Sequence, residues 1–146
     1  MDRKKFIRHC GAACLGAVSL SVLGESCSPT KQINAPLSNN QLKVPLSSFV
    51  TSKGSDMKFK RYVVIRNDQL NYPIVVYRNG EGDYTSLLLR CSHQYNELNV
   101  NGELLTCPAH GSEFDSKGNI VNGPADTKLR EFKTTIDQQH IYISLV

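Results

Sequence analysis

Two short cysteine–histidine pairs constrain this chain more than any other feature of its sequence. One residue separates Cys91 from His93, and a spacer of thirteen residues leads to the second pair, Cys107 and His110. Thiolates suit iron–sulfur clusters and zinc, whereas imidazoles suit zinc, copper and iron. A fold that uses all four side chains at one centre must therefore bring two loops to the same place.

Two kinds of metal centre could take one thiolate and one imidazole from each loop. The gap of one residue between Cys91 and His93 is too short for the usual zinc ribbon, whose paired ligands lie two to four residues apart. If each loop sends its cysteine to one iron and its histidine to the other, two thiolates and two imidazoles hold a 2Fe–2S cluster. A mononuclear zinc site in a non-redox binding module is the alternative.

Residues 42–146 resemble the Rieske family of iron–sulfur proteins. The resemblance is carried by the Cys-x-His and Cys-x-x-His-Gly-Ser motifs, by Phe114-Asp115, and by Gly123-Pro124-Ala125, which looks like the proline loop of the family. It implies one 2Fe–2S cluster per chain, with Cys91 and Cys107 on one iron and His93 and His110 on the other. It also implies that the Ser112 hydroxyl donates a hydrogen bond to a bridging sulfide.

The resemblance also predicts the redox potential. Rieske clusters span about −150 to +300 mV, and the surroundings of the cluster decide where each one falls. High-potential members carry a disulfide between the two loops, at the positions of Asn96 and Ala109, and a tyrosine at the position of Phe114. We therefore expect an intermediate potential, which Phe114→Tyr should raise and Ser112→Ala should lower. Histidines exposed at the surface, as in the family, would couple electron transfer to protonation.

Short apolar runs separated by turns predict an all-β fold. No helical periodicity of useful length follows residue 40, and the pattern indicates a small antiparallel sandwich or barrel. The resemblance places the two cluster-binding loops at one tip of that fold. Strands are expected at 42–46, 58–66, 72–78, 84–90, 103–106, 129–135 and 139–146, and turns at 79–83, 101–102 and 115–118. His140 falls in the last strand and is predicted to be a sheet residue rather than a ligand.

The first 41 residues differ from the rest of the chain. Residues 1–26 have a basic start and an apolar run, 10–24, that is short for a membrane span, so they are interpreted as an export signal or membrane anchor. The start, residues 3–7, resembles a relaxed twin-arginine signal. Cys27 lies where a bacterial lipoprotein is lipidated. Residues 27–41 are rich in Ser, Pro and Asn and are predicted to be a flexible tether. We thus expect an exported domain on the periplasmic side of a bacterial membrane.

These observations favour a one-electron carrier with no catalytic site of its own. Its partner would be a cytochrome, an oxidoreductase subunit or a quinol; a Rieske subunit of a quinol-oxidising cytochrome bc-like complex is the alternative function. An oxygenase needs a second, mononuclear iron in a separate domain, and only 36 residues follow His110. The net charge of +4 is too small to argue for nucleic-acid binding.

Overall fold

The structure, a computed structural model, describes residues 32–53 and 56–146. The predicted export segment, the lipidation site at Cys27 and the first part of the predicted tether lie outside the described residues. No helix among the described residues is long and apolar enough to cross a membrane.

Strands dominate the described chain, which confirms the predicted all-β class. One sheet contains, in spatial order, β1 (Gln32–Asn34), β6 (Tyr62–Arg66), β7 (Ile74–Gly80), β8 (Asp83–Leu88) and β13 (Glu131–Phe132). A second contains β14 (Thr134–Ile136), β15 (His140–Ser144), β3 (Gln41–Pro45) and β2 (Leu37–Ser38). A third contains β12 (Ile120–Asn122), β11 (Glu113–Phe114), β10 (Leu104–Thr106) and β9 (Asn99–Asn101). A hairpin of β4 (Val50–Lys53) and β5 (Asp56–Phe59) follows the 3-10 turn η1 (Leu46–Phe49).

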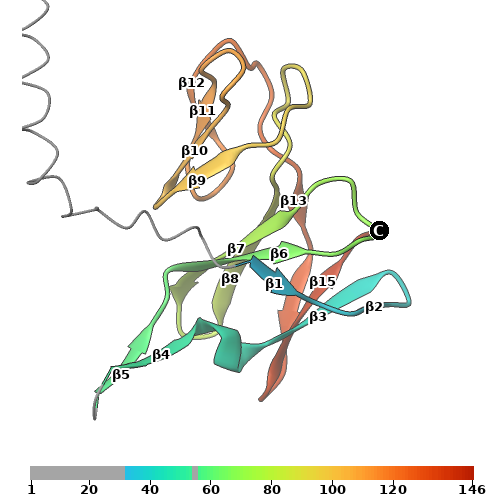
Figure 1. Cartoon of the computed structure of the whole chain (residues 1–146), viewed down its shortest axis with the longest axis vertical. Coiled ribbons are helices and arrows are strands. Elements are labelled where there is room, and N and C mark those ends of the chain that lie inside the picture. The colour runs from blue at the N-terminus through green and yellow to red at the C-terminus, as the bar shows by residue number, and fades with distance from the viewer. Residues whose placement is uncertain (1–31, 54–55) are drawn as a thin grey trace, which may run out of the picture.

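The third sheet and its loops form a separate layer at one end of the molecule, the top in Figure 1. We call residues 91–127 the head and the other described residues the base. The first and second sheets make up most of the base, and β8 leads from it into the head. Both predicted ligand loops therefore lie in the head, at the tip that the family resemblance implied.

The predicted boundary between tether and domain, at residue 42, is wrong. β1 pairs in parallel with β6, with Ile33 opposite Ile65, and β2 pairs with β3. Ala35 is fully buried, and the buried Asn67 side chain donates a hydrogen bond to its carbonyl oxygen (2.8 Å). Residues 32–38 are mostly polar, but their few apolar side chains, such as Ile33, Ala35 and Leu37, pack in or against the hydrophobic core of the base and attach this stretch to the base.

The central strands β6 and β7 are buried on both faces. Val63, Ile65, Ile74 and Val76 face a core between the first two sheets, which we call the base core. The alternate side chains of the same strands belong to a second core that extends into the head, which we call the shared core: Val64, Val75 and Tyr77 from the base, and Leu98, Leu105 and Phe114 from the head. Burial on both faces explains why the sequence of these strands is continuously apolar rather than alternating.

Candidate metal centre

The loop that carries the first ligand pair is a tight turn closed by main-chain hydrogen bonds. The Cys91 N–H donates to the Asn96 carbonyl oxygen (2.8 Å), and the Tyr95 N–H donates to the Cys91 carbonyl oxygen (2.9 Å). Tyr95 has a φ of 59°, in the left-handed region that bulky residues rarely adopt. His93 lies within this closed turn, so the main chain restricts where its ring can lie.

The loop that carries the second pair is closed in the same way. The Cys107 N–H donates to the Ser112 carbonyl oxygen (2.8 Å), and the Gly111 N–H donates to the Cys107 carbonyl oxygen (3.0 Å). Gly111 has a φ of 75° and occupies the same place, four residues after the cysteine, that Tyr95 occupies in the first loop. The two loops are thus copies of one turn, although their histidines follow the cysteines by two and by three residues.

The two turns place sulfur inside the head and imidazole outside. Cys91 and Cys107 are 1% and 3% exposed, and neither forms a disulfide. His93 and His110 are exposed, and their ring centroids are 5.3 Å apart in an edge-to-face arrangement. The structure thus brings together all four predicted ligands, which are separated by up to nineteen positions in the sequence.

The donor set suits a centre with two metal ions. A 2Fe–2S cluster requires only two protein ligands on each iron. Two buried sulfurs and two adjacent exposed imidazoles match the thiolate and imidazole sides of such a cluster.

Ser112, the fifth predicted site residue, is completely buried beside the second ligand turn. Its Oγ accepts a hydrogen bond from the main-chain N–H of Ala125 (3.0 Å), which leaves the hydroxyl proton available for donation. Phe114 is also fully buried and lies in the shared core with both cysteines. Phe114 therefore packs in the same core as the cysteines, and Ser112 adjoins Cys107 through its main-chain carbonyl; their effects on the cluster stay predictions.

A third segment, residues 122–127, lies against both ligand turns. The Asn122 side chain donates to the Gly111 carbonyl oxygen (3.3 Å) in the second turn. The Ser92 hydroxyl, in the first turn, donates to the Thr127 carbonyl oxygen (2.6 Å). Sequence reasoning recognised the proline loop within this segment but missed Ser92, because no local pattern connects positions thirty-five residues apart.

The charged groups around the site are held by aromatic rings and by ion pairs. Arg90 lies over the exposed Tyr95 ring, 4.6 Å from its centroid. Further along the head, the Glu97 carboxylate forms an ion pair with Arg66 of the base (2.7 Å). Partial burial opposes ionisation of Asp115, but hydrogen bonds from Asn119 and Lys117 outweigh it and lower the pKa of that carboxyl. Asp115 thereby stays ionised and fixes the turn between β11 and β12.

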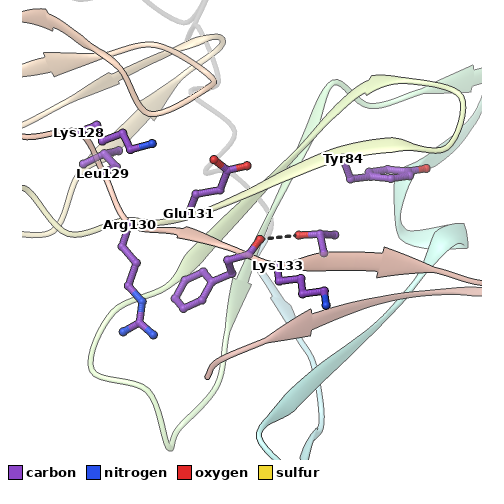
Figure 2. A pocket seen from close by; sticks show the side chains of 8 residues that line it. Tyr84, Lys128, Leu129, Arg130, Glu131 and Lys133 are labelled. Carbon is purple, nitrogen blue, oxygen red and sulfur yellow. Dashed lines mark hydrogen bonds between the residues drawn. The ribbon is translucent and has the colours of Figure 1, made fainter.

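Basic residues after the third segment line an open groove on the base, together with Tyr84. Figure 2 shows Lys128 near the head and Arg130 pointing away from Lys128 and Glu131. The Arg130 guanidinium lies 4.8 Å from the Phe132 ring centroid and donates to the Leu145 carbonyl oxygen (2.9 Å). Arg130 is therefore committed to packing on the base rather than directed toward the ligand turns.

An all-β head with two cysteine–histidine turns defines a class of iron–sulfur electron-transfer domains. The family model of the Rieske [2Fe-2S] domain matches residues 48–133, more than half of the chain. The chain belongs to the Rieske family, and a Rieske domain binds a 2Fe–2S cluster and transfers electrons with it. The predicted family and cofactor are confirmed.

Relatives of the chain come from two groups of proteins. The chain is 27% identical over 82 residues to the cytochrome b6-f complex iron-sulfur subunit of Chlorobaculum tepidum, covering 53% of this chain and 44% of the relative. It is 41% identical over 59 residues to the oxygenase component of dicamba O-demethylase from Stenotrophomonas maltophilia, covering 38% of this chain and 17% of the relative. The chain thus spans less than half the length of either curated relative.

Solved structures show the same fold. A chain from the complex of reduced oxygenase and oxidized ferredoxin in carbazole 1,9a-dioxygenase has a TM-score of 0.53 at 20% identity, covering 74% of this chain and 95% of that one. The plasma membrane Rieske protein of the cyanobacterium Synechocystis has a TM-score of 0.50 at 24% identity, covering 57% of this chain and 86% of that one. At these identities the likeness concerns the fold alone.

Proposed function

We propose that this protein is a one-electron carrier whose 2Fe–2S cluster is bound by Cys91 and Cys107 on one iron and by His93 and His110 on the other. The observation that carries the proposal is the pair of matched turns, which bury both sulfurs and expose both imidazoles side by side. The cluster, when bound, accepts and donates one electron at a time.

Different residues would shield the cluster, transfer the electron and donate a hydrogen bond. The shared core surrounds Cys91 and Cys107 and excludes water from the thiolate side. Exposed His93 and His110 face a partner directly, so that an electron leaves through the imidazoles. The outer ring nitrogen of a bound imidazole can also release or take up a proton, which couples the two transfers. Buried Ser112 supplies a hydroxyl donor beside the second turn.

Analysis of the isolated protein for iron and acid-labile sulfide tests this proposal. We expect two irons and two sulfides per chain, a brown colour, and a paramagnetic resonance signal after reduction. His93→Cys should change the visible spectrum, whereas His140→Asn should not, because His140 lies in β15 of the base. A colourless protein that contains zinc instead would refute the proposal.

A quinol-oxidising cytochrome bc-like complex is the second candidate, since the b6-f iron-sulfur subunit is among the relatives. Asn96 and Ala109 stand at the places of the loop disulfide of high-potential members, and Phe114 stands at the place of their tyrosine. These substitutions favour an intermediate potential. Reduction of the purified protein by a quinol, or co-purification with a cytochrome b, would favour the second candidate over the first.

We further propose that the domain is exported and held at the outer face of a bacterial membrane, with Cys27 as the lipidated residue. The basic start, the apolar run and the cysteine that follows it support this proposal. The intact mass of the mature protein tests it: a chain that begins at Cys27 and carries acyl groups is expected. An uncleaved chain would indicate an N-terminal anchor instead.

A further inference from the structure

The two ligand turns have no hydrogen bond directly between them among the described residues. Each turn is closed by its own main-chain bonds, and each also contacts the segment 122–127. The second turn makes two such bonds, one through the Ser112 side chain and one through the Gly111 carbonyl oxygen. The first turn makes one, through the Ser92 hydroxyl. The hydrogen-bonded connection of the His93 turn to its counterpart therefore runs through a single side-chain donor, beside the packing of Cys91 and Cys107 in the shared core.

We propose that Ser92 is a positioning residue for the cluster: its hydrogen bond to Thr127 holds the His93 turn against the segment that also holds the His110 turn. The path runs from Ser92 to Thr127, along the main chain to Ala125, and through the Ala125 N–H to Ser112. This inference rests on the proposed assignment of His93 and His110 as ligands.

The position of Ser92 in the chain explains why this hydrogen bond could affect the metal ligands. Ser92 lies between Cys91 and His93, so a shift of the main chain at Ser92 would move two proposed ligands at once. The O–H···O distance of 2.6 Å is at the short end for hydroxyl donors. No disulfide joins the turns, because Cys91 and Cys107 are both free and no other cysteine lies among the described residues.

The acceptor of this bond is a main-chain carbonyl oxygen, which makes the inference sharply testable. A change of the Thr127 side chain keeps the acceptor, whereas a change of Ser92 removes the donor. Threonine retains the hydroxyl at position 92, and valine has nearly the same shape as threonine without it. The pair Ser92→Thr and Ser92→Val therefore separates the hydrogen bond from the volume of the side chain.

Release of iron from the loaded protein to a chelator measures how often the first turn opens. We expect Ser92→Ala and Ser92→Val to release iron about threefold to tenfold faster than the wild type, the change that loss of one ordinary hydrogen bond produces. Ser92→Thr and the control Thr127→Ala should release iron at the wild-type rate. The resonance signal of the reduced cluster should shift in the alanine and valine variants only, because it reports the geometry of the histidine ligands.

Two results would overturn the inference: equal release rates in the wild type and Ser92→Val, or the same acceleration in Ser92→Thr as in Ser92→Val. Failure of the proposed function is a different result. A wild-type protein that holds neither iron nor sulfide refutes the ligand assignment before any variant is compared.

Discussion

The head and the base are both built from β-strands, but different interactions hold them. In the base, β7 is seven residues long and pairs with a strand on each side. In the head, every strand has two or three residues. Strands this short contribute few ladder hydrogen bonds. The head must therefore depend on the shared core, on closed turns and on the metal ligands that we propose.

The contents of the two cores show the same difference. The base core consists of aliphatic side chains and phenylalanine, with alternating residues of β3, β6 and β15 supplying much of it. The shared core also contains Cys91 and Cys107. Because metal binding contributes directly to folding where ligands join separate segments, the cluster should stabilise the head far more than the base. The following variants test that difference.

Loss of a thiolate ligand should have the largest effect. We expect Cys107→Ser to abolish the cluster and to accelerate amide hydrogen exchange across β9–β12, while β6 and β7 stay protected. Removal of iron from the wild type should produce the same pattern, which provides the control. Equal loss of protection in β6 and β7 would show that the head and the base unfold together.

Removal of a buried phenyl ring from each core comes next. Phe114 and Phe49 are almost completely buried, the first in the shared core and the second in the base core. Each change to alanine should lower the free energy of unfolding by about 3–5 kcal/mol in urea titrations. Only Phe114→Ala should also accelerate the release of iron. An equal release rate in Phe49→Ala would remove the distinction between the cores.

Replacement of two fully buried serines, Ser112 in the head and Ser86 in the base, should have smaller effects on stability. Ser112→Ala leaves the Ala125 N–H without its acceptor and should cost about 1–3 kcal/mol. It should also lower the midpoint potential by removing the proposed donor to sulfide, whereas Phe114→Tyr should raise it. Ser86 in β8 accepts a hydrogen bond from the Thr134 hydroxyl (2.8 Å), and Ser86→Ala should leave the potential unchanged. A shift in potential for Ser86→Ala would argue against a specific role for Ser112.

The ion pairs that connect the head to the base should have the smallest effect. Arg61 pairs with Glu103 and Arg66 pairs with Glu97, both at 2.7 Å, with all four side chains more than 40% exposed. Each change of the glutamate to glutamine should cost less than about 1 kcal/mol, and the cost should vanish at high salt. A large loss that persists at high salt would mean that charge, rather than the shared core, attaches the head.

The sequence predicted those features that depend on nearby residues. Apolar runs located β7 and β8, and Asn101-Gly102 located the hairpin between β9 and β10. The predicted strand 58–66 is in fact two strands, β5 and β6, with a break at Lys60 and Arg61. The motif also gave the four candidate ligands, because their spacing is specific by itself.

The features that it missed depend on contacts between distant residues. The residues around Tyr95 do not predict that it has a left-handed backbone conformation. Only comparison with Gly111 in the folded turns reveals the common geometry. The attachment of residues 32–38 to the base needed Ala35 to be buried beneath Asn67. The hydrogen bond from Ser92 to Thr127 likewise exists only once the head has folded.

Burial of β6 and β7 on both faces limits how a carrier of this shape can deliver an electron. Rotation of the head relative to the base would separate the side chains that the two parts contribute to the shared core. These apolar side chains would then be exposed to water, which is unfavourable. Travel of the two imidazoles between a donor and an acceptor must then be a movement of the whole domain. The distance over which the imidazoles can move is therefore set by the attachment of the whole domain and not by movement of the head relative to the base.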